Sequence, residues 1–221
     1  TSYSKAIQIK PDHVETYNNI GNVLKKLNRT KEAIDNYNKA ISLNPDNKEF
    51  WKNLSFSIVN YSFDSYDEQT ANNILQILNY KTLVKPYSLI KPILSLLNCH
   101  PKLQKIYQML SSNNIDKFFK KICNDLIEIN LFQKFIELCP IPDFTVEYLL
   151  KELRKNLLLN NNLVVNKESV LIFQVSLALH CFLNEFIFGE TKEEILAIKI
   201  LEKDLKDSFI NKKKLDPYKI A

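Results

Sequence analysis

Four cysteines and three histidines are the side chains of this chain that could bind a metal ion or supply a nucleophile. Neither type is grouped for that chemistry. No two cysteines stand in C-x-x-C spacing, and the adjacent pairs Cys99–His100 and His180–Cys181 project about 100° apart on a helix. We therefore predict buried free thiols in a reducing cytoplasm, no metal site and no catalytic cysteine.

A second set of polar side chains lies in the segment 167–188. Ser176, His180 and Asn184 are four residues apart and share one stripe of a helix, with Gln174 and Glu185 nearby. One interpretation is a contact line for another domain, or an acid–base pair of His180 and Glu185. We favour the alternative that these groups satisfy one another, or the backbone, within the core, because buried polar groups are normally paired. The sequence predicts no catalytic residue.

Only two glycines occur, Gly21 and Gly189. Phosphate-binding loops and dinucleotide-binding turns need several positions where only a bare backbone fits, so we predict no cofactor in this segment. The hairpins of β proteins also draw on glycine for positive φ angles. The scarcity of glycine therefore favours an all-α fold.

The net charge is +5, and the positive residues are nearly all lysine, with arginine only at positions 29 and 154. Nucleic-acid recognition favours the guanidinium fork and stacking aromatic residues, and no such patch is visible. A run of about 18 apolar residues is also missing. We expect no nucleic-acid partner and no membrane association, and a cytoplasmic location.

The helices that would position these residues begin with an internal repeat. Six positions match at a displacement of 34. Tyr3, Ala6 and Pro11 recur as Tyr37, Ala40 and Pro45, and the same shift places Tyr17, Ile20 and Leu24 on the similar residues Trp51, Leu54 and Ile58. A fixed period of this length is the sequence signature of a helical-repeat protein. Each two-helix unit then needs neighbours to cover its apolar faces.

The full unit, Val14 to Asn47, resembles the consensus of the tetratricopeptide repeat (TPR) over its whole length. We expect its first helix at 14–27 and a second helix that starts at Thr30, which we predict as the N-cap, and ends before Pro45. Gly21 and Ala33 are small where two helices must approach closely. The fold that this resemblance implies is the end of a right-handed α-solenoid.

We divide the chain at residue 61. Residues 1–13 form a partial repeat, 14–47 the full repeat and 48–61 a half repeat with a helix at 49–61, so that 1–61 is the C-terminal end of a TPR array. A further shift of 34 gives Asp67, Ala71 and Asn79, which do not fit the pattern. Residues 62–221 are then an irregular α-helical bundle or linker domain. Because Thr1 falls within the second helix of a repeat, we expect residues upstream.

Eight further helices are predicted, at 67–79, 86–98, 101–111, 114–129, 131–138, 144–160, 167–188 and 191–209. Asp143 and Asn166 are expected N-caps, Thr191 with Glu194 forms an expected capping box, and 160–162 is an expected loop. The segment 167–188 has almost no polar face, so we predict that it is the central helix of the bundle.

The same region resembles the helical middle segment of bacterial TPR-containing SAM-dependent methyltransferases. The similarity rests on Pro140, Pro142 and Asp143, on Leu153–Arg154–Lys155, and on 178–188 followed by Thr191–Glu194. His180 stands where the family pattern has Gln. The resemblance implies a methyltransferase domain that binds S-adenosylmethionine in the parent chain, downstream of Ala221. Whether the parent chain is an enzyme stays open.

Our leading functional hypothesis is a non-catalytic protein-interaction segment that binds a protein or peptide in the TPR groove. In peptide-binding TPR arrays an inward-facing Asn grips the peptide main chain, and Asn19 and Asn53 occupy that position. Asn22, Lys25, Lys52 and Phe56 lie on the neighbouring inner surface. The alternatives are that so few repeats form no groove, that the region precedes a glycosyltransferase or sulfotransferase, or that the chain is a free-standing adaptor.

Overall fold

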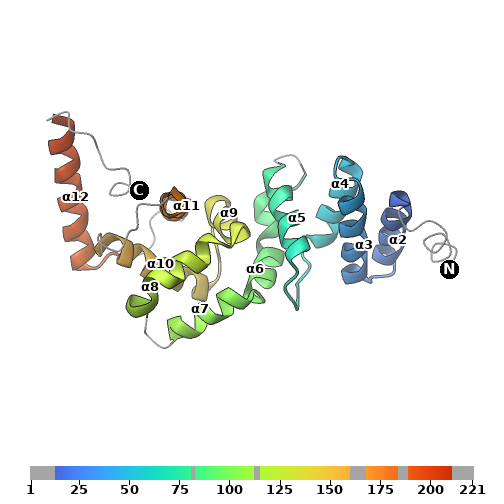
Figure 1. Cartoon of the computed structure of the whole chain (residues 1–221), viewed down its shortest axis with the longest axis horizontal. Helices are drawn as coiled ribbons and strands as arrows, with labels where there is room; N and C mark the ends of the chain where they lie inside the picture. The colour runs from blue at the N-terminus through green and yellow to red at the C-terminus, as the bar shows by residue number, and fades with distance from the viewer. Residues whose placement is uncertain (1–12, 81–82, 112–114, 160–167, 184–188, 211–221) are drawn as a thin grey trace. The chain divides into compact units, whose positions relative to one another are not determined.

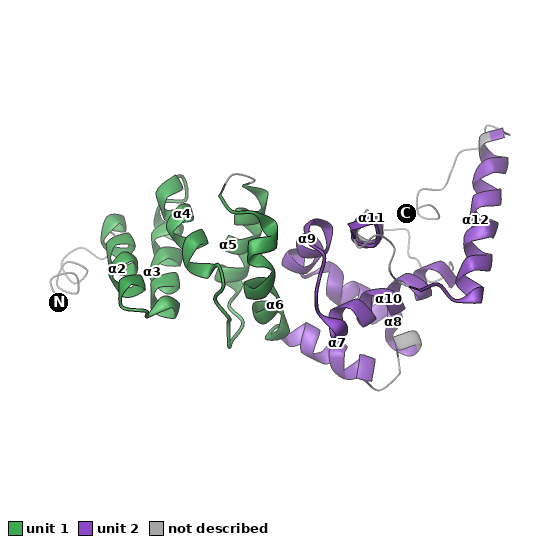
Figure 2. Cartoon of the chain, turned by 180° about the vertical axis from the view of Figure 1, so that it is seen from behind, with its two compact units in different colours: residues 1–100 green, residues 101–221 purple. Residues whose placement is uncertain are grey.

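The structure is a computed structural model of the whole chain, and it describes residues 13–80, 83–111, 115–159, 168–183 and 189–210 (Figure 1). Within these residues every regular element is a helix, which confirms the all-α prediction. The expected partial repeat at 1–13, the cap Asn166 and the loop at 160–162 fall almost entirely outside the described residues. The chain forms two compact units, residues 1–100 and 101–221 (Figure 2).

The first unit begins with a tight hairpin of two helices, α2 (Val14–Lys26) and α3 (Thr30–Leu43). Tyr37 on α3 is completely buried, and its ring packs directly on the backbone of Gly21 on α2. A Cβ atom at position 21 would lie 2.6 Å from Cε1 of Tyr37. Ala33 and Ala40 are also fully buried. The predicted role of small residues at this helix crossing is therefore confirmed.

The start of α3 corrects one prediction. Thr30 is the first residue of the helix, and Arg29 takes the N-cap position without a side-chain cap bond. The cause is the preceding turn, where Asn28 has a φ of 60° and the Arg29 amide donates to the Leu24 carbonyl at 2.9 Å. The guanidinium of Arg29 instead binds the Glu32 carboxylate, with Nε 2.6 Å from Oε1.

A second helix pair follows, α4 (Lys48–Ile58) and α5 (Glu68–Asn79). Asn47 caps α4 by accepting a hydrogen bond from the Glu49 amide at 3.0 Å. The helix ends at Ile58, three residues before the predicted end at 61, because the chain turns at Asn60, where φ is 66°. Helix α5 packs against both α3 and α4, although it lies beyond the end of the sequence repeat.

Buried amides hold α5 on α3. The side chain of Asn38 on α3 donates to Thr70 Oγ1 at 2.8 Å and accepts from Asn73 Nδ2 at 2.9 Å. Its backbone carbonyl accepts from Gln69 Nε2 at 3.1 Å. Asn38 is only 3% exposed, so these bonds satisfy a side chain that has little access to water.

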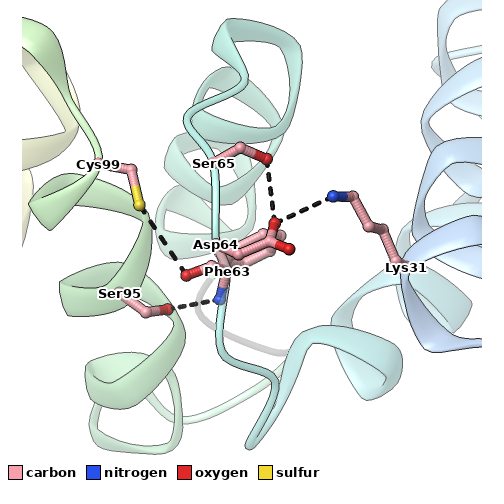
Figure 3. Close-up of polar contacts among 6 residues, drawn as sticks. All are labelled: Lys31, Phe63, Asp64, Ser65, Ser95 and Cys99. Carbon is pink, nitrogen blue, oxygen red and sulfur yellow. Dashed lines mark hydrogen bonds and ion pairs between the residues drawn. The ribbon is translucent and has the colours of Figure 1, made fainter.

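The connection 59–67 runs between α3 and α6 (Ile90–Asn98), which follows a short 3-10 turn, η1 (Pro86–Leu89). Figure 3 shows its polar contacts: Asp64 forms an ion pair with Lys31 on α3 at 3.0 Å, and the Phe63 amide donates to Ser95 on α6 at 2.9 Å. The thiol of Cys99 points to the Phe63 carbonyl at 4.0 Å. The connection is thus fixed on both sides.

The predicted division at residue 61 lies where the 34-residue pattern ends. As a domain boundary it stays a prediction. Helices α5 and α6 lie with the repeat helices in the first compact unit, which extends to His100. In that unit, helices α2, α3 and α4 stand side by side in chain order (Figure 1).

The second unit contains six helices in its described residues: α7 (Pro101–Ser111), α8 (Ile115–Ile127), α9 (Asn130–Leu138), α10 (Phe144–Leu159), α11 (Glu168–Leu183) and α12 (Lys192–Ile210). Two predicted caps are confirmed. Asp143 Oδ1 accepts from the amides of Thr145 and Val146, each at 3.0 Å. Thr191 and Glu194 form the capping box, with bonds of 2.8 and 3.3 Å.

Helix α11 does not have the environment that we predict from its sequence. It packs on α9 and α8 through Phe173, Leu177 and Cys181, which lie on one face. On other sides Val175 and Phe182 are 45% and 68% exposed. The prediction of a central helix is therefore wrong, because apolar composition alone does not tell how many neighbours a helix has.

Candidate functional site

Helix α2 presents a polar stripe next to α4. Asn18, Asn22 and Lys25 are spaced by four and three residues, so their side chains lie above one another on one helix face. Asn18 is buried, Asn22 is half-buried and Lys25 is exposed. The small Gly21 beside Asn22 allows α3 to pack closely behind this stripe.

An amide pair joins the stripe to α4. Asn53 Nδ2 donates to Asn18 Oδ1 at 2.9 Å. This bond joins α2 and α4, the first helices of successive units in the 34-residue register predicted from the sequence, and it fixes the two helices side by side. The backbone carbonyl of Asn53 accepts in turn from Ser57 Oγ at 2.8 Å.

A second contact joins α2 and α4 about two turns further along α2 and about one turn further along α4. The Lys25 ammonium lies 6.0 Å from the centroid of the Phe56 ring, within the range of a cation–π interaction. The Phe56 side chain is 53% exposed, so the ring presents its remaining surface to water. Partial burial lowers the pKa of Lys25 from its usual value.

Tyr37 supports the middle of the stripe from α3. Its hydroxyl donates to Asn22 Oδ1 at 2.8 Å. Burial raises the pKa of Tyr37, and a hydrogen bond with Ser57 opposes part of that rise. The phenol is therefore a neutral hydrogen-bond donor that orients the Asn22 amide.

These bonds leave the face rich in hydrogen-bond donors. The side-chain oxygens of Asn18 and Asn22 accept from Asn53 and Tyr37. Because Asn18 is buried, the accessible donors on α2 are then the NH2 group of the half-buried Asn22 and the Lys25 ammonium. We refer to Asn18, Asn22, Lys25, Asn53 and Phe56 as the α2–α4 face.

Four of the six predicted site residues, Asn22, Lys25, Asn53 and Phe56, belong to the α2–α4 face. The other two, Asn19 and Lys52, are exposed, and no hydrogen bond of their side chains to the face occurs in the described residues. The role of Asn19 as a peptide clamp stays a prediction. Sequence reasoning missed Asn18, although its spacing from Asn22 and Lys25 follows the helical period.

The polar stripe of α11 is paired with α9. Ser176 Oγ donates to Glu137 Oε1 at 2.8 Å, and His180 Nδ1 lies 3.3 Å from the Ile136 carbonyl. Both side chains are fully buried, and burial lowers the pKa of His180. Pairing within the core is confirmed for these two residues, whereas Asn184 and Glu185 lie outside the described residues.

The described part of the chain contains no group of three His, Cys, Asp or Glu side chains that could hold a metal ion. All four cysteines are free thiols. Within the same residues no helix is both long enough and apolar enough to cross a membrane.

Helices α2 and α3 form a hairpin, and α2 and α4 both contribute to one face, an arrangement that is typical of helical repeats. The repeat itself is a tetratricopeptide repeat: residues 14–47 match the family model of that name, over the range predicted from the 34-residue period. No curated protein and no solved structure matches the chain. Residues 14–47 thus form a segment similar to a tetratricopeptide repeat, and such repeats generally mediate contacts between proteins.

Proposed function

We propose that the chain is a protein-interaction segment in which the α2–α4 face binds an extended peptide. The observation that carries this proposal is the Asn53–Asn18 bond, which joins the amides of α2 and α4 beside the exposed Lys25 and Phe56. Side-chain amides suit this role because they match the donors and acceptors of a peptide main chain.

The donor-rich chemistry of the face favours peptides with acidic side chains. The Asn22 NH2 group and the Lys25 ammonium bind carbonyl and carboxylate oxygens, and Phe56 offers a surface for an apolar side chain next to them. A peptide rich in lysine offers mainly donors at the same positions, so it is disfavoured.

The test is isothermal titration calorimetry of the 221-residue chain against three end-blocked peptide pools that are acidic, neutral or basic. We expect binding of the acidic pool. Lys25→Gln should weaken that binding about five- to tenfold, or about 1–1.4 kcal/mol. The matched control is Lys26→Gln, which removes the same charge from the adjacent position of α2.

Two further variants test the amides. Asn18→Ala and Asn53→Ala each remove one half of the bridging pair, and Asn19→Ala tests the clamp expected from the family pattern. Unchanged affinity in all three variants would exclude a role of these amides in binding. If no pool binds to the unmodified chain, the proposed function itself is wrong.

A second candidate is that the parent protein is a SAM-dependent methyltransferase whose TPR region selects its substrate. The support is the resemblance around Pro140–Asp143 and around Thr191–Glu194. Both elements act as helix starts in the structure, since Asp143 begins α10 and the capping box begins α12. In this proposal S-adenosylmethionine binds elsewhere in the parent chain, in a bacterial cytoplasm.

Its test is the coding sequence beyond position 221. The proposal requires a strand, a glycine-rich turn and a helix, followed about 20 residues later by an acidic residue, as in nucleoside-binding α/β domains. A parent chain without such a domain removes this candidate and leaves the peptide-binding proposal untouched.

A further inference from the structure

Helix α12 is attached to the second unit through few fully buried side chains. Among its described side chains only Glu194 is buried, with 1% exposure. Leu196 and Ile200 are 61% and 54% exposed, and the apolar side chains on the face of Glu194, which are only partly buried, are Ala197, Ile198, Leu201 and Leu205. Most helices in compact domains are held by a fully buried apolar face, and no apolar side chain among the described residues of α12 is fully buried, so the helix depends more on its one buried polar contact.

That interaction centres on the Glu194 carboxylate. Its Oε1 accepts from Arg154 Nη2 on α10 at 2.9 Å. Its Oε2 accepts from the Thr191 amide at 2.8 Å, which satisfies one of the free donors at the start of α12. One carboxylate therefore both starts the helix and ties it to α10.

Arg154 on α10 is the partner of Glu194 in this ion pair. Its side chain is 19% exposed, so water screens the ion pair only in part. The guanidinium also lies beside the Cys181 thiol of α11 and opposes the rise in the pKa of Cys181 that burial causes. Three helices, α10, α11 and α12, thus meet at this one side chain.

We propose that the Arg154–Glu194 pair is a latch, and that α12 detaches from α10 as a unit when the latch opens, while α8–α11 stay folded. Two physical features support this. Breaking a buried ion pair leaves an uncompensated charge, so the closed state depends strongly on both partners. Helices with few buried apolar contacts open locally at lower free energy than the core.

The test is hydrogen exchange of the full chain, read by mass spectrometry. In the unmodified protein, amides at 195–208 should exchange faster than those at 149–153 on α10. Arg154→Met and Glu194→Gln should each accelerate exchange at 195–208 at least tenfold and leave 149–153 and 119–126 unchanged. Gln retains the capping acceptor, so Glu194→Gln separates the charge from the cap.

The matched control is Glu202→Gln, which removes an exposed charge from the same helix. Alkylation of Cys181, located by mass spectrometry, gives an independent readout, because its thiol contacts Arg154. We expect faster alkylation of Cys181 in Glu194→Gln, with unchanged rates at the buried Cys123 and Cys139.

Three results would overturn the latch: exchange of α12 as slow as that of α10 in the unmodified chain, no effect of either latch variant, or equal acceleration throughout α8–α12. The last result would mean that the pair belongs to the common core. All of these readouts lie in the second unit, so they are independent of peptide binding by α2 and α4.

Discussion

Gly21 illustrates how one residue fixes the spacing of two helices. Three atoms of the Tyr37 ring lie within 3 Å of the position that a Cβ atom at residue 21 would occupy. The ring is fully buried and its hydroxyl is bound to Asn22, so it has little freedom to move aside. A larger residue at position 21 therefore has to separate α2 from α3.

We predict that Gly21→Ala destabilises the first unit by up to about 2 kcal/mol. The clash costs about 1–3 kcal/mol, and the better helix propensity of Ala returns only about 1 kcal/mol. Urea unfolding measures the difference. Gly189→Ala is the control, since nothing lies within 4 Å of a Cβ atom there. A Gly21→Ala protein as stable as the control would contradict the packing of Tyr37 on Gly21.

His180 gives a prediction about pH. Burial lowers its pKa in the folded state below the usual value of about 6.5. The unfolded chain therefore binds a proton first as the pH falls, and stability is full above about 6.5 and decreases from there toward the lower folded pKa.

We expect the melting temperature of the second unit to fall between pH 7.5 and 5.5. His180→Gln should reduce that fall, because the amide does not titrate. Calorimetric scans at both pH values measure it. An identical pH dependence in His180→Gln would show that another group is responsible.

At the scale of elements, α5 shows that a sequence repeat does not reveal all the contacts between helices. Its residues no longer follow the repeat, yet α5 packs on α3 through the buried amide of Asn38 and its partners Thr70, Asn73 and Gln69. Hydrogen bonds of this kind have no fixed period in the sequence. These hydrogen bonds can be recognised only once the positions of both helices are known.

We predict that Asn38→Ala destabilises the first unit by about 1–3 kcal/mol, because it leaves the buried Thr70 and Asn73 without their partner. Amides of α5 should exchange faster than in the unmodified chain. The neighbouring exposed residue provides the control, Lys39→Ala. Unchanged protection in α5 would mean that apolar packing alone holds this helix.

Most helix positions could be predicted from the sequence, because capping residues and apolar periodicity are local signals. The cap at Asp143 and the box of Thr191 and Glu194 are examples. Thr30 is a counterexample. Because Asn28 adopts a left-handed conformation, the turn ends at Arg29, which takes the N-cap position, and Thr30 is already the first residue of the helix. The exposed face of α11 was unpredictable because it depends on neighbours that the segment itself does not specify.

The candidate site shows the same limit. The repeat register located α2 and α4 and hence Asn22, Lys25, Asn53 and Phe56. It did not reveal that Asn53 binds Asn18, because this bond depends on how the two helices are placed relative to each other. The family pattern instead pointed to Asn19, which is exposed.

For the whole molecule, the two compact units each have a buried core of their own. Leu54 on α4 and Leu149 on α10 are both completely buried, one in each unit. The stability of each unit should therefore respond to its own core residues.

We predict that Leu54→Ala and Leu149→Ala each cost about 2–5 kcal/mol in the unit that contains the substitution. Hydrogen exchange should accelerate in residues 14–80 for the first variant and in 119–158 for the second. The two variants serve as controls for each other. Equal acceleration in both ranges for either variant would show that the units unfold together.

Trp51 has a consequence for optical measurements. It is the only tryptophan in the chain, it is 7% exposed on α4, and its indole N–H donates to the Pro45 carbonyl at 2.6 Å. Its intrinsic fluorescence therefore reports on the first unit alone, whereas far-UV circular dichroism reports on the helices of both units. Comparing the two signals along one denaturation curve separates the unfolding of the units without any label.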